Sequence, residues 1–132
     1  MEQYILQLRQ LFSKYPEIKL VYFFGSKAKN KGSLLSDYDF AVYFDKKTNV
    51  ARIKEIVFSL IAEISSILKT DKIDLVILNQ PISPVLKFNI IKDGKLIYEQ
   101  PPYRLLVEPF IYSEYFDFKV FTHSLVNLKK YD

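Results

Sequence analysis

The sequence predicts an α/β fold, in which flanking helices cover a small mixed β-sheet and a helical extension follows at the C-terminus. Three observations predict it. Short apolar runs rich in branched and aromatic residues alternate with a long segment whose apolar residues repeat at helical spacing. The chain has 132 residues, which suits one hydrophobic core. Composition changes after Pro101-Pro102, where aromatic residues crowd together. We therefore expect a single domain over 1–132, with a core at about 1–99 and a helical extension at about 103–132.

The first predicted elements are a helix and two strands. Apolar residues between 4 and 12 fall on one helix face. The apolar run at 18–24 predicts a buried strand, and 37–44 predicts a second strand rich in aromatic and branched residues. Between them lies a polar loop, 27–36, which is long enough for the two strands to pair antiparallel.

A strand–helix–strand unit occupies the middle of the chain. The clearest helix runs over about 50–69, where apolar residues repeat at helical spacing and Thr48 or Asn49 can cap the start. The run at 72–78 predicts a third strand. Because a crossover helix makes the strands it joins parallel, 37–44 and 72–78 should lie parallel in the sheet.

Two further elements complete the predicted core. Ser83-Pro84 is typical of a helix start, with a capping side chain followed by proline at the first helical position, and Gly94 is typical of a helix end. The segment 95–99 predicts a short edge strand.

The C-terminal extension should be a helix with two different surroundings. Apolar residues between 110 and 126 occupy too many helical directions for one buried stripe. We expect one side to pack on its own domain and the other to contact a partner. Pro109 should start this helix or kink it.

Composition excludes several classes of protein. Without cysteine, the chain has no disulfides, thiol catalysis or cysteine-ligated zinc, and the single histidine, His123, cannot form a histidine metal site alone. No run approaches the roughly 18 apolar residues that a membrane helix needs, and the N-terminus does not resemble a signal peptide. We expect a cytoplasmic protein with no membrane partner.

Three aspartates stand out because they interrupt apolar strands. Asp37 and Asp39 are two residues apart, so both carboxylates project from one face of a strand, where they repel each other without a cation. Asp74 lies near the start of the parallel third strand, at the same end of the sheet. Carboxylate oxygens are the ligands that Mg²⁺ prefers, so this end of the sheet is a candidate metal site.

A phosphate-sized turn should reach the same end. Gly25 lets the backbone approach a phosphate closely, and Ser26 offers a hydroxyl and an N–H to its oxygens. Lys27 can offset the charge of a departing pyrophosphate. The sequence therefore predicts a nucleotide-binding site made of Gly25, Ser26 and Lys27 beside the three carboxylates.

The phrases GSKAKNKGSLLSDYDFAV and KIDLVIL together resemble the DNA polymerase β-like nucleotidyltransferases, and within them the minimal nucleotidyltransferase (MNT) group. The resemblance implies a palm-like fold and Mg²⁺-dependent transfer of AMP from ATP to a hydroxyl group. It implies that Asp37 and Asp39 bind metal, that Asp74 activates the acceptor hydroxyl, and that Ser26 holds the triphosphate. Asn30 stands where the family often has glycine, and asparagine tolerates the positive φ that this turn needs.

The resemblance also implies a partner. Many MNT proteins are antitoxins that silence HEPN-family ribonuclease toxins by adenylylating a tyrosine, so we expect a protein adenylyltransferase in a hetero-oligomer with such a toxin. Nucleic acid is not expected as a direct partner. Two alternatives stay open at this point: a non-catalytic antitoxin that blocks its partner sterically, and a nucleotidyltransferase acting on RNA or on a small molecule such as an aminoglycoside.

Overall fold

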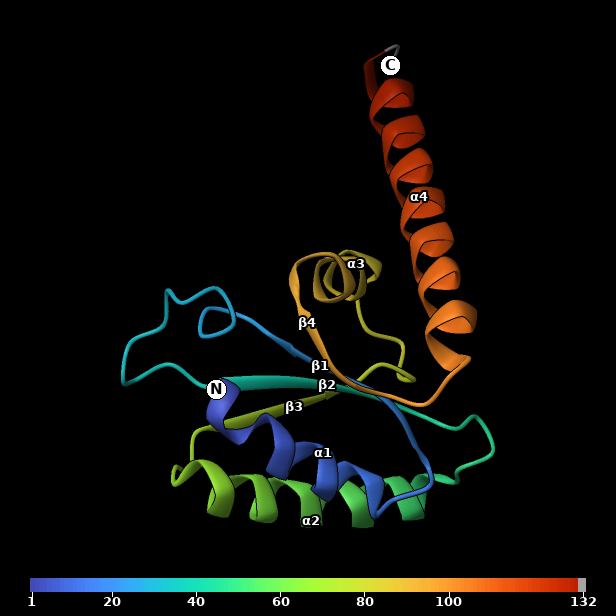
Figure 1. Ribbon diagram of the computed structural model, residues 1–132. Coiled ribbons are helices and arrows are strands. Elements are labelled where there is room, and N and C mark those ends of the chain that lie inside the picture. Colours follow the sequence, from blue (N-terminus) through green and yellow to red (C-terminus); the bar gives the residue numbers. More distant parts are fainter. Residues whose placement is uncertain (131–132) are drawn as a thin grey trace.

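The computed structural model describes residues 1–130, with side chains to residue 127. It forms a four-stranded sheet with helices on both faces (Figure 1). In chain order the elements are η1 (Glu2–Tyr4), α1 (Ile5–Ser13), β1 (Ile18–Phe24), β2 (Tyr38–Phe44), α2 (Val50–Leu68), β3 (Ile73–Ile77), α3 (Pro84–Asp93), β4 (Lys95–Glu99) and α4 (Tyr103–Lys130). None of the helices in this part of the chain combines the length and apolar character that crossing a membrane requires.

The strand order is β3-β2-β1-β4. β1 pairs antiparallel with both β2 and β4, whereas β2 pairs parallel with β3 through the α2 crossover. The predicted mixed sheet, its strand directions and the edge position of β4 are therefore confirmed. β2 begins at Tyr38, so Asp37 lies immediately before the strand instead of inside it.

Each face of the sheet carries its own core, because alternate strand residues point to opposite sides. On one face α1 and α2 pack against the sheet, and on the other α3 and the first turns of α4 do so (Figure 1). The α1/α2 core includes Leu8, Phe12, Val21, Phe23, Phe40, Val42, Phe44, Ile56, Leu60 and Ile64. The α3/α4 core includes Leu20, Tyr22, Ala41, Tyr43, Leu78, Ile90, Ile91, Val107 and Ile111.

Helix ends follow the local chemistry that the sequence predicted. The Asn49 side chain caps α2 by accepting a hydrogen bond from the Arg52 N–H at 2.8 Å. The Ser83 side chain accepts from the Val85 N–H at the start of α3, where Pro84 occupies the first turn. α2 ends one residue before the predicted Lys69, because Lys69 turns into the left-handed region with φ 57°.

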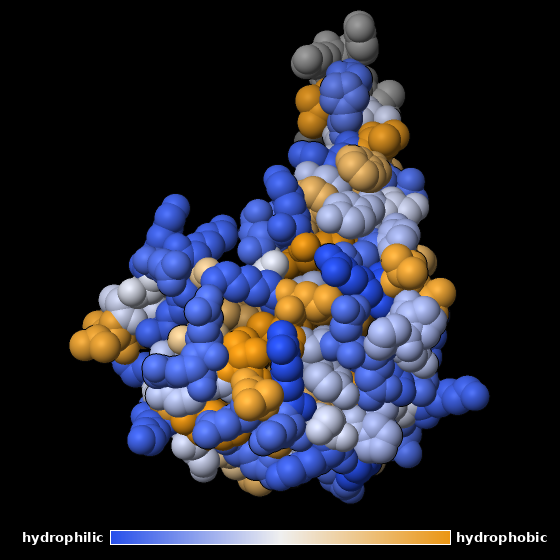
Figure 2. All heavy atoms as spheres, in the orientation of Figure 1, coloured by the Kyte–Doolittle hydropathy of each residue, from blue (hydrophilic) through white to orange (hydrophobic). Residues whose placement is uncertain are grey.

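The long helix α4 is attached to the domain by its first turns only. Val107 and Ile111 are buried, and the Tyr22 hydroxyl donates to Glu108 at 3.2 Å. One turn further on, the Tyr115 ring stacks on Phe88 of α3 with centroids 3.8 Å apart. Beyond this contact α4 projects from the domain, and Figure 2 shows apolar side chains exposed along it.

The prediction that Pro109 starts this helix is wrong, because α4 begins at Tyr103 and continues through Pro109. Proline removes the hydrogen bond that its N–H would donate to the carbonyl of Leu105. Leu105 is on an exposed side of the helix, where water can satisfy that carbonyl. The helix therefore tolerates proline at this position.

Candidate functional site

The three aspartates gather at one end of the sheet. Asp39 is opposite Phe24 at the end of β1 and beside Asp74 near the start of β3. The Phe40 side chain belongs to the α1/α2 core, so Asp39 faces the α3/α4 side. Asp37 precedes β2 and is exposed, as is Asp74, while Asp39 is partly buried. The structure thus places the two strand aspartates side by side and the third just ahead of them.

Electrostatics link the three carboxylates. Burial, which is the largest cause, and the negative charges of Asp74 and Asp37 together raise the pKa of Asp39 from its ordinary value of 3.8 to about 6. A hydrogen bond with Asp74 acts in the same direction, because it favours the protonated form. The ionised form of Asp39 is therefore short of compensating positive charge, as expected where a cation binds.

Gly25 is required by the position of Asp39. Its φ is +84°, and a Cβ added there would overlap Oδ2 of Asp39. Any other residue would both strain the backbone and displace the carboxylate. The turn after β1 and the carboxylate on β2 consequently fit together as one unit.

A compact loop follows this turn. The carbonyl of Ser26 accepts hydrogen bonds from the N–H groups of Lys29 and Lys31, at 3.1 and 2.9 Å, and the Ser26 side chain is exposed. Asn30 adopts φ 57°, the left-handed conformation that the sequence led us to expect it to tolerate. The Ser26 side chain is therefore free to meet a ligand at the carboxylate end of the sheet.

Lys27 is not brought to the carboxylates. Its ammonium group donates to the carbonyl of Ser33 at 3.0 Å and lies 4.5 Å from the centroid of the Tyr38 ring. Tyr38 packs against the α1/α2 core, on the opposite side of β2 from Asp39. In this structure Lys27 holds the loop closed, and its contact with a triphosphate stays a prediction.

The donor set suits Mg²⁺ shared with a nucleotide. All three side chains offer hard carboxylate oxygens, yet within residues 1–130 no three acidic or histidine side chains are close enough to enclose a metal by themselves. Mg²⁺ is usually held by one or two carboxylates together with substrate phosphates and water, and not by an all-protein cage. The open, acidic end of this sheet is consistent with such shared coordination of Mg²⁺.

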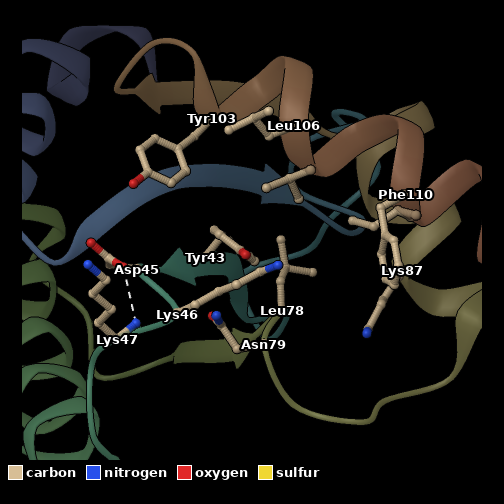
Figure 3. Close-up of a pocket in the computed structure, with 12 residues that line it drawn as sticks. Tyr43, Asp45, Lys46, Lys47, Leu78, Asn79, Lys87, Tyr103, Leu106 and Phe110 are labelled. Carbon is tan, nitrogen blue, oxygen red and sulfur yellow. Dashed lines mark hydrogen bonds between the residues drawn. The ribbon is translucent and has the colours of Figure 1, made fainter.

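A second feature lies at the other end of the α3/α4 face. A pocket of about 660 Å³ opens between the end of β2 and the first turns of α4 (Figure 3). Sequence reasoning missed it, because its walls come from segments far apart in the chain and no motif marks them. They include Tyr43, Lys46, Lys47, Leu78, Leu106 and Phe110.

Comparison with known proteins agrees with this geometry. Residues 7–103 match the family model described as polymerase beta, nucleotidyltransferase. The protein adenylyltransferase MntA of Aphanizomenon flos-aquae is 34% identical over 107 aligned residues, and the match covers 74% of this chain and 70% of that protein.

Solved structures share the fold. A crystal structure of a mutant MntA–HpeT toxin–antitoxin complex matches with 27% identity and TM-score 0.66, over 96% of this chain and 95% of that chain. A toxin–antitoxin structure with AMP-PNP matches with 23% identity and TM-score 0.71 over the same shares. The complex of tri-AMPylated Shewanella oneidensis HEPN toxin with MNT antitoxin matches with 22% identity and TM-score 0.67, again over 96% and 95%. On the motifs, the α/β fold and these matches, the chain belongs to the polymerase β-type nucleotidyltransferase family.

Proposed function

We propose that this protein is an adenylyltransferase that moves AMP from ATP to a tyrosine of a HEPN toxin, and so acts as its antitoxin. One observation carries the proposal. Asp39 lies next to Asp74 in the sheet and close to Asp37, and the turn at Gly25 packs directly against Asp39. In the reaction, the acceptor oxygen forms a bond to the α-phosphorus of ATP. The bond from that phosphorus to the oxygen bridging to the β-phosphorus breaks, and pyrophosphate leaves.

Asp37 and Asp39 are the proposed metal ligands. The shortage of positive charge around Asp39 supports this assignment, because a cation would favour its ionised form. Mg²⁺ bound there would neutralise charge on the phosphates and on the leaving pyrophosphate. Ser26, exposed beside the Gly25 turn, is the proposed contact to the triphosphate.

Asp74 is the proposed general base. A tyrosine hydroxyl has a pKa near 10, so it needs a base beside it to lose its proton at neutral pH. Asp74 is exposed and adjoins Asp39 in the parallel register, so an acceptor approaching from solvent can reach it. The proton of the tyrosine hydroxyl passes to the Asp74 carboxylate as the new bond forms.

The relatives support both the reaction and the partner. The protein with 34% identity is named a protein adenylyltransferase. Among the structures with the same fold, one holds AMP-PNP and another contains an AMPylated HEPN toxin. Docking of a protein partner can itself supply the proximity that the transfer needs.

The test is transfer to the cognate HEPN toxin with ATP and Mg²⁺, followed by intact mass and peptide mapping. We expect one or more adenylyl masses on tyrosine. Asp37→Asn should lose transfer together with Mg²⁺–ATP binding, whereas Asp74→Asn should lose transfer and keep most of the binding. Neutralisation of the toxin without ATP and without any change in its mass would instead identify a non-catalytic antitoxin. If RNA or an aminoglycoside is labelled and the toxin is not, that molecule is the acceptor in place of the toxin tyrosine.

A further inference from the structure

The pocket at the end of β2 combines apolar walls with exposed edges. Leu78 and Val107 are buried in its wall, whereas Leu106 and Phe110 of α4 are 63% and 67% exposed at its border. Such large apolar side chains at the border of a concave site are typical of surfaces that bind another protein. The volume of about 660 Å³ is ample for one large side chain and its neighbours.

The pocket also carries an excess of positive charge. Lys46, Lys47 and Lys87 line it, against the single carboxylate of Asp45. Lys87 is paired with Glu114 at 3.8 Å. Within the part of the chain whose side chains are described, Lys46 and Lys47 form no ion pair. A ligand that complements this site therefore carries carboxylates as well as apolar surface.

The pocket and the carboxylates share one face of the sheet. Asp39, Ala41 and Tyr43 alternate along β2 and point to the α3/α4 side. At about 3.3 Å per strand residue, Tyr43 in the pocket wall is roughly 13 Å from Asp39. A protein bound at the pocket can therefore reach the carboxylates with another part of the same surface.

We propose that this pocket receives an apolar side chain of the HEPN toxin that has acidic residues beside it, and that this contact orients the toxin for transfer. The inference rests on the proposed function for the identity of the partner. A protein fits better than a small ligand, because the apolar border at Leu106 and Phe110 continues onto the exposed surface of α4. Acidic residues on the toxin would complement Lys46 and Lys47.

The experiment measures the dissociation constant for the cognate toxin by calorimetry without ATP, so that no transfer takes place. Two double variants test the pocket: Leu106→Ala with Phe110→Ala, and Lys46→Glu with Lys47→Glu. The controls are Leu6→Ala on α1, which is 67% exposed, and Phe58→Ala on α2, which is 81% exposed, because both helices cover the opposite face of the sheet from the pocket. All these side chains are exposed or at a border, so the melting temperature of the free protein checks that each variant is folded.

We expect each pocket variant to weaken binding by about tenfold or more, as is typical of interface anchors, and each control by less than about twofold. The lysine variant should also reduce the salt dependence of binding. Unchanged binding in both folded pocket variants would overturn the inference, and so would an equal loss in the controls. If the protein self-associates, and only the pocket variants abolish this self-association while toxin binding is unchanged, the pocket binds a second copy of the chain and the inference is wrong.

The failure of the two proposals can be told apart. If the wild-type protein binds the toxin through this pocket but transfers no AMP, the proposed function fails and the docking site stands. If the wild-type protein transfers AMP and the pocket variants bind normally, the docking site fails and the function stands.

Discussion

Replacing Asp39 by asparagine should stabilise the free protein at neutral pH. The carboxyl has a pKa of about 6, against an ordinary value of 3.8, so the folded state holds its proton more tightly than the unfolded state does. Between these two values the folded state binds more protons, and the free energy of unfolding falls as pH rises. The loss of stability caused by ionised Asp39 in the folded protein is fully present above about pH 7 and absent below about pH 4.

The size of the effect follows from the shift. A rise of about two pKa units corresponds to about 3 kcal/mol, at 1.36 kcal/mol per unit. Because Asp39 is only partly buried, solvent screening reduces this to about 1–1.5 kcal/mol. For a chain of this length, that is a rise in melting temperature of roughly 3–6 °C at pH 8 in the absence of divalent metal.

The assay is thermal unfolding of wild type and Asp39→Asn from pH 4.5 to pH 8, with and without Mg²⁺–ATP. We expect the difference in melting temperature between the variant and the wild type to shrink as pH falls below 6. At a Mg²⁺–ATP concentration of about 100 times its dissociation constant, binding should stabilise the wild type by about 2.7 kcal/mol and reverse the order. Asp71→Asn, at an exposed position outside the sheet, is the matched control and should change neither curve. A variant that is less stable than wild type at pH 8, or a difference independent of pH, would refute the reasoning.

Three other substitutions test the packing. Gly25→Ala should destabilise the protein by about 1–3 kcal/mol in urea unfolding and lower nucleotide affinity, because the new Cβ meets Asp39 at a positive φ. Lys69→Gly should stabilise it by about 0.5–1 kcal/mol, since Lys69 ends α2 in the left-handed region; a loss of stability there would contradict the explanation. Phe88→Leu should cost about 1 kcal/mol and speed amide exchange around Tyr115, while unchanged exchange would mean that the ring stack does not hold α4.

Much of the fold was predictable because its signals are local. The apolar runs and the helical repeat define β1, β2, α2 and β3, and the crossover then fixes which strands are parallel. The same logic placed Asp74 at the same end of the sheet as Asp37 and Asp39, and the strand register of the structure shows that Asp39 is its direct neighbour. Their close approach to Gly25 is likewise implied by antiparallel pairing of β1 with β2.

What could not be predicted depends on long side chains and on contacts between distant segments. The ammonium of Lys27 turns to the Tyr38 ring and the Ser33 carbonyl, a choice among rotamers that tertiary surroundings decide. The continuation of α4 through Pro109 depends on solvent access to one carbonyl, and on the burial of Val107 and Ile111, which anchors the turns on either side. Neither condition is visible in sequence spacing.

The edge position of β3 has a consequence for the kind of product that the enzyme can make. Asp74 belongs to the outermost strand of the sheet on that side, and its side chain is exposed, so no wall of the described chain stands between it and solvent. A bulky acceptor can slide in or withdraw along this border without the opening of a lid. If AMP is transferred as proposed, the attached nucleotide would carry a hydroxyl of its own, which could return to the same place as the next acceptor. The number of nucleotides added would then be limited by how far the attached product can move away from Asp74. The mass of the modified acceptor, followed over time, would show whether additions stop at one.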